Sequence, residues 1–375
     1  MSLRPGPVVG LDIGTSAVRA AQVAEGRGSR RLLRFAQMPL PAGAVVDGEV
    51  RDPGPIAEAV AELWKRAKLG SKKAVVGVSN QRVVVRQVDM PFLEEKEFRA
   101  SLQYQIADHI PMPVEDAQLD ARILGDYEND DGHFMRVLVV AAATDMVEGF
   151  LTVMSAAGIE PVGVDLTAFA ATRAVSPAAR GENGLPGSEA VVDIGAGVTT
   201  VLIHQSAEPV FVRMLLLGGD VATDALAKEL SVSFEEAEAI KLNIEEAVTV
   251  PAPAASSNVS SVMTNPTPGA AAKDSTRVIA SHVDSLVGEI RGSLDYFLSQ
   301  EGSEPLVSVV LTGGGSLVPG LVSALEDSLD VQVARGNALE GLDVEGSGLM
   351  ADQAEQVAHV AAAAVGLSMG RRAKR

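Results

Sequence analysis

The same short pattern occurs twice in this chain. Residues 8–23 read "VVGLDIGTSAVRAAQV" and residues 190–204 read "AVVDIGAGVTTVLIH". Each is an apolar strand, then Asp-Ile-Gly, then small residues and a second apolar strand, so that Asp12 and Asp193 occupy equivalent places. A buried carboxylate without a partner is costly. One such hairpin is often only a turn, but two of them predict a chain of two similar halves that face a common ligand.

The residues of both hairpins suit a polyphosphate ligand. The glycine after Asp-Ile permits a tight turn with open backbone N–H groups, and nearby Ser and Thr hydroxyls add donors. Because like charges repel, we expect Asp12 and Asp193 to hold a hydrated Mg²⁺ beside the phosphates and to help orient an attacking water. Arg19, on the second arm of the first hairpin, can reach back to a phosphate oxygen.

A glycine run follows a third apolar strand. Residues 306–329 read "LVSVVLTGGGSLVPGLVSALEDSL", which predicts a buried strand, the loop 313–316 and a helix from about Val318. Such a loop lets a nucleotide approach the backbone and the positive end of the helix. The alternative is an ordinary strand-to-helix loop, although three consecutive glycines cost more chain entropy than such a loop requires.

Composition excludes several functions. The chain has 375 residues, of which 47% are hydrophobic, and is expected to form two or so globular domains. It has no cysteine, which excludes disulfides and thiolate sites and fits a reducing cytoplasm. The formal net charge of −18 argues against a nucleic-acid partner. The N-terminal segment lacks the apolar core of a secretory signal, and no apolar run reaches the ~18 residues of a membrane-spanning helix.

Hydrophobic periodicity and turn residues divide the chain further. We expect residues 82–160 to form a βαββα subdomain inserted in the first half, and residues 250–273, rich in Pro, Ala, Ser and Asn, to be a disordered insertion. The predicted domains are a first lobe at 1–81 and 161–187, the inserted subdomain at 82–160, a second lobe at 188–345, a C-terminal helix that packs back on the first lobe at 346–370, and a basic tail at 371–375.

These motifs together resemble the nucleotide site of the superfamily that contains actin, the sugar kinases and the heat-shock chaperone ATPases. "DIGTSAVRA" is similar to its first phosphate motif, "DIGAGVTT" to its second and "LTGGGSLVPGL" to its adenosine motif. The resemblance implies an α/β actin-like ATPase fold, with two lobes around a cleft for ATP and Mg²⁺. Arg19 stands where members usually have Lys, which keeps the charge. The implied nucleotide-binding residues are Gly14, Thr15, Ser16 and Arg19, then Gly195, Gly197, Val198 and Thr199, then Gly313, Gly314, Gly315 and Ser316.

Two further segments resemble parts of the superfamily site. Residues 233–244, "SFEEAEAIKLNI", predict a helix on which Glu238 and Lys241 share a face. In the superfamily a Glu and a Lys on this helix line the ribose and adenine. The alternative is a solvated ion pair that contributes little to the stability of the fold. Asp165 stands just before a predicted helix. It is a candidate catalytic carboxylate, together with Asp193, but capping that helix is an equally open role.

The inserted subdomain separates branches of the superfamily. FtsA cell-division proteins and PilM pilus assembly proteins carry such a module, and residues 102–124, "LQYQIADHIPMPVEDAQLDARIL", are similar to a PilM helix followed by its Ile-Pro-x-Pro corner. "GIEPVGVDLTAFAATRA" and "SFEEAEAIK" resemble PilM as well. The alanine-rich last helix, residues 351–369, reads as core and not as the amphipathic helix with which FtsA holds the membrane.

The PilM resemblance implies a cytoplasmic ATP-binding scaffold of the type IV pilus machine, with at most weak ATPase activity. Its partner would be the cytoplasmic N-terminal segment of a bitopic inner-membrane protein, PilN, which would hold the chain at the inner face of the membrane. That peptide would lie between the first lobe and the inserted subdomain. Met90, Pro91, Ile110 and Pro111 are exposed-looking apolar candidates for this contact, but packing at the subdomain boundary is the role that we favour for each.

Two other functions compete with this interpretation. An FtsA-like membrane tether that polymerises end to end would share the fold. A sugar kinase would share the first phosphate motif, but it needs a base beside a polar sugar pocket, and no separate cluster of that kind is found.

Overall fold

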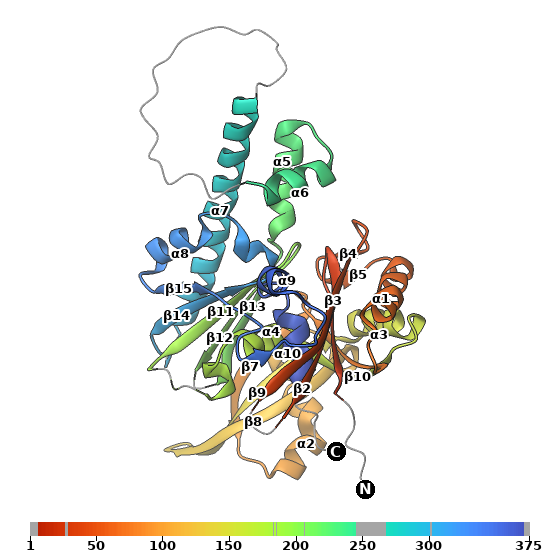
Figure 1. The fold of residues 1–375 in the computed structure, drawn as a ribbon. Coiled ribbons are helices and arrows are strands. Elements are labelled where there is room, and N and C mark those ends of the chain that lie inside the picture. Colours follow the sequence, from red (N-terminus) through yellow and green to blue (C-terminus); the bar gives the residue numbers. More distant parts are fainter. Residues whose placement is uncertain are drawn as a thin grey trace.

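The computed structural model describes residues 7–26, 29–182, 184, 186–205, 207–244, 268–300 and 302–370. Two lobes with similar central sheets stand side by side, and a smaller three-stranded subdomain lies against both of them (Figure 1). The predicted insertion at 250–273 lies outside the described residues up to residue 267, and the tail at 371–375 does so entirely. Residues 268–273, expected within the insertion, instead form the start of a helix. Within the described ranges no helix is long and apolar enough to cross a bilayer.

The first lobe is a six-stranded sheet with helices on both faces. Its strand order is β10-β6-β1-β2-β3-β16, in which β1 pairs antiparallel with β2 and parallel with β6. Helices α1 and α3 pack against one face, and α4 and α10 against the other. The elements are β1 (Val9–Ile13), β2 (Ala17–Glu25), β3 (Arg30–Pro39), the small pair β4 (Val45–Val46) and β5 (Glu49–Val50), α1 (Pro53–Ala67), β6 (Lys73–Val78), α3 (Thr144–Ala156), β10 (Glu160–Leu166), α4 (Thr167–Val175), β16 (Leu342–Asp343) and α10 (Ala362–Met369).

The second lobe repeats the central arrangement of the first. Its strand order is β13-β12-β11-β14-β15, and β11 pairs antiparallel with β12 and parallel with β14, as β1 does with β2 and β6. Its core joins these strands to helices α5, α7 and α8. The elements are β11 (Ser188–Ile194), β12 (Thr199–Gln205), β13 (Glu208–Leu215), α5 (Gly219–Leu230), α6 (Phe234–Leu242), α7 (Pro268–Leu298), β14 (Leu306–Thr312), α8 (Leu321–Leu329) and β15 (Gln332–Arg335). Helix α9 (Ala351–Val357) buries Val357 in a cluster that holds residues of both lobes.

The inserted subdomain is shorter than we expected. It consists of β7 (Val83–Pro91), α2 (Glu95–Gln105), β8 (Ala117–Asn129) and β9 (Gly132–Ala143), with strand order β7-β9-β8. The helix predicted to complete it, α3, instead buries Phe150, Val153 and Met154 in the core of the first lobe beside α1. The subdomain is therefore βαββ, and the prediction of a βαββα unit over 82–160 is wrong at its C-terminal end.

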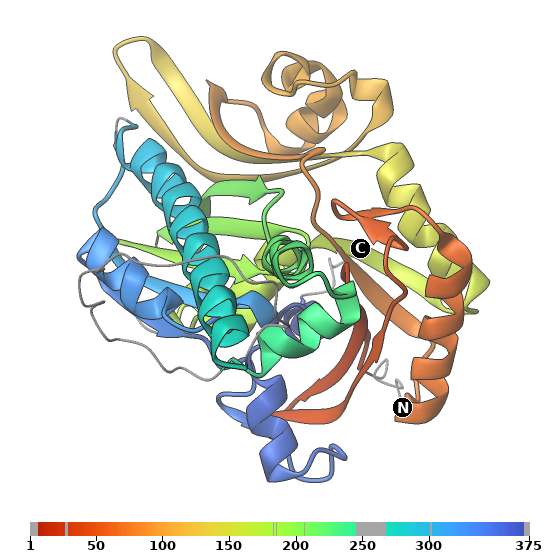
Figure 2. The ribbon, with the colours of Figure 1, turned by 90° about the horizontal axis from the view of Figure 1, so that it is seen from above.

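The subdomain also bonds to the second lobe, although its chain is inserted in the first. The Gln87 side-chain amide donates to the carbonyl of Pro209 at 2.8 Å, and Arg122 pairs with Glu208 at 2.6 Å. Both acceptors lie on β13, the edge strand of the second-lobe sheet. Viewed from above, the subdomain runs alongside both lobes (Figure 2).

The C-terminal region corrects two further expectations. Residues 342–343, which we placed in the second lobe, form β16 and pair with β3 in the first-lobe sheet. The predicted last helix is two helices, α9 and α10, because the carbonyl of His359 between them accepts hydrogen bonds from the Gly313 N–H at 2.8 Å and the Thr312 hydroxyl at 3.0 Å. Helix α10 packs tightly on α4, since a Cβ on Gly366 would stand only 1.7 Å from the carbonyl oxygen of Ala170.

Candidate functional site

The two Asp-Ile-Gly hairpins face each other between the lobes. Their turns are closed alike: the N–H of Gly14 donates to the carbonyl of Ala17 at 3.0 Å, and the N–H of Gly195 to that of Val198 at 2.9 Å. The loops are in close contact, because a Cβ on Gly197 would lie 2.7 Å from the hydroxyl oxygen of Thr15. The repeat recognised in the sequence is thus a pair of matching turns, one from each lobe, at a single place.

The two aspartates lie close enough to affect each other. Asp12 is 13% exposed at its side chain and stands opposite Arg19, whose guanidinium nitrogen is 3.6 Å from the carboxylate. Burial raises the pKa of Asp12, and Arg19 opposes that shift. Burial, with the nearby Asp12 carboxylate, raises the pKa of Asp193 to about 7. Two half-buried carboxylates side by side favour a cation between them.

The glycine run packs onto the second hairpin. Gly313 has a φ of +81°, and a Cβ there would lie 2.4 Å from the carbonyl oxygen of Ile194 and 2.6 Å from a carboxylate oxygen of Asp193. Gly315 is equally constrained by Ile194, whereas Gly314 is exposed and meets nothing closer than 3.8 Å. Two of the three glycines are therefore required by the protein's own packing, quite apart from any ligand.

The helix after this loop begins later than expected. A 3₁₀ turn, Gly314–Leu317, follows the strand, and α8 starts at Leu321 instead of about Val318. The hydroxyl of Ser316 is fully buried and donates to the carbonyl of Gly313 at 2.6 Å. The positive end of α8 is consequently separated from the glycine run by that turn. A nucleotide could therefore approach the backbone of the glycines, but the start of α8 does not directly follow them as we expected.

A hydroxyl pair joins the lobes beside the hairpins. Ser79 follows β6 in the first lobe, and its hydroxyl lies 3.0 Å from that of Thr200 on β12. The neighbouring Thr199 donates its hydroxyl to the carbonyl of Leu217 at 2.5 Å, and its contact with phosphate stays a prediction. Sequence reasoning missed Ser79. Its signal was a polar residue just beyond the end of β6, which runs parallel to β1 and so ends at the same edge of the sheet as Asp12.

Glu238 and Lys241 belong to an enclosed network. Their ion pair measures 2.6 Å, and the Lys241 side chain is only 11% exposed. The ammonium also donates to the hydroxyl of Thr223 at 2.8 Å and to the carbonyl of Gly219 at 3.1 Å. The N–H of Gly219 in turn donates to the carbonyl of Gly195 at 3.0 Å. The pair is thus connected to the second hairpin and is not a solvated pair on a helix surface.

Two titratable residues near this network were not predicted. Burial raises the pKa of Asp220, which Lys241 partly opposes. Burial, with Lys241 nearby, lowers the pKa of His282, and both ring nitrogens of His282 are buried without a partner in the part of the chain that the structure describes.

Asp165 is occupied by an ion pair. Its carboxylate contacts Arg173 of α4 at 3.0 Å and accepts from the N–H of Leu166 at 2.8 Å. Because α4 begins at Thr167 with Leu166 as its N-cap residue, Asp165 does not hold the capping position. Its role in orienting water stays a prediction.

The four apolar residues suggested for peptide binding are not exposed as a group. Met90 and Ile110 are buried in the core of the inserted subdomain, at 4% and 8% exposure, whereas Pro91 and Pro111 are exposed. Met90 pairs with Met135 near the end of β7 that is distant from the first lobe. Met90 and Ile110 therefore pack, as we favoured, although in the core of the subdomain and not at its boundary.

The paired hairpins, the lobes that carry them and the glycine loop behind them define an actin-like ATPase fold. A sequence model of the family described as type IV pilus assembly protein PilM matches residues 10–248. The chain belongs to the PilM family. A model of cell division protein FtsA also matches residues 190–365.

Individual relatives agree with this placement. The solved PilM–PilN type IV pilus biogenesis complex is 27% identical, with a TM-score of 0.80, and the match covers 97% of this chain and 98% of that one. The fold is shared with MreB 5 of Spiroplasma citri bound to AMPPNP, at 14% identity and a TM-score of 0.50 over 89% of this chain and 92% of that one. FtsA of Streptococcus pneumoniae is 26% identical over 53% of this chain, but the match spans only 42% of the length of that protein.

Proposed function

We propose that this chain is a nucleotide-binding scaffold of type IV pilus assembly that binds the cytoplasmic N-terminal segment of a PilN-like inner-membrane protein. The observation that carries the proposal is its likeness, over nearly the whole chain, to a solved complex of PilM with PilN. Membership of the PilM family supports it independently. The protein would then work in the cytoplasm and be held at the inner membrane by its partner, with slow hydrolysis at most.

The residues between the hairpins fit a magnesium nucleotide. The Nε of Arg19 is buried and has no hydrogen-bond partner among the described residues, so a donor is available to a phosphate oxygen. The turns at Gly14 and Gly195 offer further backbone donors. Within the described ranges no cluster of three or more metal-binding side chains occurs, so Mg²⁺ held near Asp12 and Asp193 would take its other ligands from phosphate and water. The Mg²⁺ ion bound with ATP would supply the positive charge that favours ionisation of both carboxylates.

Closure of the lobes is the step through which nucleotide would influence the partner. The Ser79–Thr200 pair and the contact of Thr15 with Gly197 join the lobes at the hairpins. A ligand gripped by both hairpins would favour this closed arrangement. The inserted subdomain, bonded to β13 at Pro209, lies beside both lobes and would share in that change.

Calorimetry with a synthetic peptide tests the proposal. The peptide is the N-terminal cytoplasmic segment of the PilN-like protein from the same genome, and a scrambled peptide is the control. We expect saturable binding of the native peptide only, and tighter binding with Mg²⁺-ATP than without nucleotide. Absence of binding in every nucleotide state would contradict the proposal.

An FtsA-like polymer is the second candidate, because the FtsA family model matches the second lobe and the C-terminal region. Light scattering with Mg²⁺-ATP distinguishes the two. Growth of the signal with protein concentration, without peptide binding, would favour the polymer. Peptide binding by a chain that scatters as a small particle would favour the scaffold.

A further inference from the structure

A buried glutamate lies at the start of the central strand of the second lobe. Glu189 on β11 is 7% exposed and stands directly opposite His204 of β12 and Ser308 of β14. One carboxylate oxygen contacts the ring Nε2 of His204 at 3.0 Å, and the other accepts from the Ser308 hydroxyl at 3.0 Å. These hydrogen bonds hold the pKa of Glu189 below its usual value although burial opposes them, so the carboxylate is charged at neutral pH.

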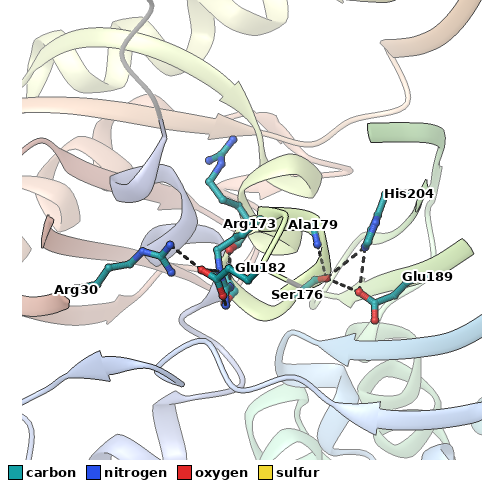
Figure 3. A network of polar contacts seen from close by, with 9 residues as sticks. Arg30, Arg173, Ser176, Ala179, Glu182, Glu189 and His204 are labelled. Carbon is teal, nitrogen blue, oxygen red and sulfur yellow. Dashed lines mark hydrogen bonds and ion pairs between the residues drawn. The ribbon is translucent and has the colours of Figure 1, made fainter. Parts of the chain in front are cut away.

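The fourth member of this cluster comes from the other lobe. Ser176 caps the C-terminal end of α4 and is fully buried; its hydroxyl donates to Glu189 and lies 3.3 Å from the ring of His204. The hydroxyl also accepts from the N–H of Ala179 at 3.0 Å. Figure 3 shows Ser176, Glu189 and His204 turned toward one another. We call Ser176, Glu189, His204 and Ser308 the crossing cluster.

The cluster sits where the chain passes between the lobes. After Ser176 the chain leaves α4 and enters β11 at Ser188. Along the crossing, Glu182 is bound by Arg180 and by Arg30 of β3, each at 2.9 Å. Figure 3 shows the contact between Arg30 and Glu182. The crossing is thus tied to the first lobe through exposed ion pairs and to the second lobe through the buried cluster.

Burial of a charged residue at this position costs desolvation free energy. Well-packed apolar residues of similar volume often stabilise a core as well as a buried ionic group does. The position of Glu189 on β11 suggests a role other than core packing. Because side chains alternate along a strand, Glu189 shares a face of β11 with Asp193, four residues away and about 13 Å along the strand. The strand that presents Asp193 to Asp12 at one end is therefore fixed to α4 at the other.

We infer that Glu189 is a positioning residue, which through Ser176 fixes β11 against α4 and thereby sets how Asp193 meets Asp12 across the cleft. The inference rests on the proposed nucleotide binding between the hairpins. It goes beyond that function by assigning control of the lobe geometry to the crossing cluster, in which Ser176, Glu189 and His204 are buried and Ser308 is partly buried.

The test compares two variants, each of which removes one serine hydroxyl that donates to the Glu189 carboxylate. Ser176→Ala and Ser308→Ala each remove one hydroxyl from Glu189, but only Ser176 belongs to the first lobe. Because the chain has no cysteine, spin labels can be attached at Glu58→Cys of α1 and Lys228→Cys of α5, both exposed, and the distance between the lobes measured. Affinity for a fluorescent ATP analogue is measured on the same proteins, with melting temperatures as the check on folding.

We expect Ser176→Ala to broaden the distance distribution without nucleotide and to weaken nucleotide affinity about threefold or more, as the loss of a buried hydrogen bond would. Ser308→Ala should leave both unchanged despite a similar loss of thermal stability, and Ser176→Thr should restore the original behaviour. Equal behaviour of the two alanine variants would overturn the inference. If the unmodified protein bound no nucleotide, the proposed function would fail, and the distance distributions alone would then decide the inference.

Discussion

At the residue scale, the two aspartates of the repeat have unequal surroundings. Asp12 has Arg19 as its cross-strand partner and pairs with it, whereas Asp193 lies opposite Thr200, a neutral residue. Burial therefore raises the pKa of both carboxylates, but only Asp12 has a cross-strand cation that would lose its partner if the carboxylate were removed. Substitutions at the two positions should have opposite effects on stability.

Asp193→Asn should stabilise the protein in the absence of ligand. The pKa of Asp193 is raised to about 7, so the folded state binds a proton that the unfolded chain releases near pH 4. The stabilising contribution of Asp193 is fully present below that lower value and is lost as the pH rises through about 7. At pH 8 the variant should be more stable by about 1–3 kcal/mol, and at pH 4 by almost nothing. Urea denaturation at both pH values, without nucleotide, measures the difference; a constant difference would contradict it.

Asp12→Ala should abolish binding of Mg²⁺-ATP and also weaken the fold. The second effect follows from the ion pair, because Arg19 would be left 17% exposed without its carboxylate. We expect a loss of about 1–3 kcal/mol, measured by denaturation, beside the loss of nucleotide binding measured by calorimetry. The matched control is Asp12→Ala with Arg19→Met, which should recover stability but not binding. If Asp12→Ala alone were as stable as the unmodified protein, the Asp12–Arg19 ion pair would contribute to ligand binding and not to the stability of the fold.

At the element scale, local patterns were predictable and long-range pairings were not. The two hairpins, the strand before the glycine run and the helix with Glu238 and Lys241 follow from periodicity, turn residues and capping within short windows. The two residues of β16 carry no pattern of their own, and their partner β3 lies some three hundred residues earlier. Helix α3 looked like part of the subdomain because it follows its last strand, but its apolar face fits the first-lobe core.

The candidate site shows the same division. The two aspartates and their turns could be found because a repeat makes each motif support the other. Ser79 and Thr223 were missed because each is a single hydroxyl outside any repeated motif; the partner of Ser79 lies over a hundred residues away, and that of Thr223 lies on the next helix. Packing could be favoured for Met90 and Ile110 because they are apolar, but the core to which they belong could not be named before the pairing of three strands was known.

Gly313→Ala should disrupt the glycine loop, and Gly314→Ala should not. At Gly313 the left-handed backbone and the 2.4 Å approach to the Ile194 carbonyl oxygen leave no room for a methyl group. We expect a loss of about 3 kcal/mol or more in unfolding free energy. Gly314 is exposed with no positive φ, so its alanine variant should lie within about 0.5 kcal/mol of the unmodified protein. Similar denaturation midpoints for both would mean that the loop relaxes.

At the scale of the whole molecule, the Ser79–Thr200 hydroxyl pair joins the lobes near the hairpins. It links the end of β6 in the first-lobe sheet to β12 in the second-lobe sheet. Hydroxyl pairs of this kind contribute little to the stability of either lobe alone. Their effect should appear where the lobes must close together, namely in the binding of a ligand that both hairpins grip.

A double-mutant cycle measures that effect. Ser79→Ala and Thr200→Val should each weaken the affinity for Mg²⁺-ATP, by an amount that corresponds to about 0.5–1.5 kcal/mol. The double variant should be no weaker than either single one, because the same hydrogen bond is lost in all three. Additive losses, measured by calorimetry, would show that the two hydroxyls act separately.

The inserted subdomain leaves the first lobe and returns to it at nearly one point. The N–H of Ala143, at its exit, donates to the carbonyl of Arg82, at its entry, over 3.2 Å. Chain ends that already share a hydrogen bond can be rejoined with a short linker, so an ancestral two-lobed protein could acquire this unit in one insertion event without a change to its own sheets. Selection could then reshape the surface of the subdomain for a new partner while the aspartate hairpins stayed as they were.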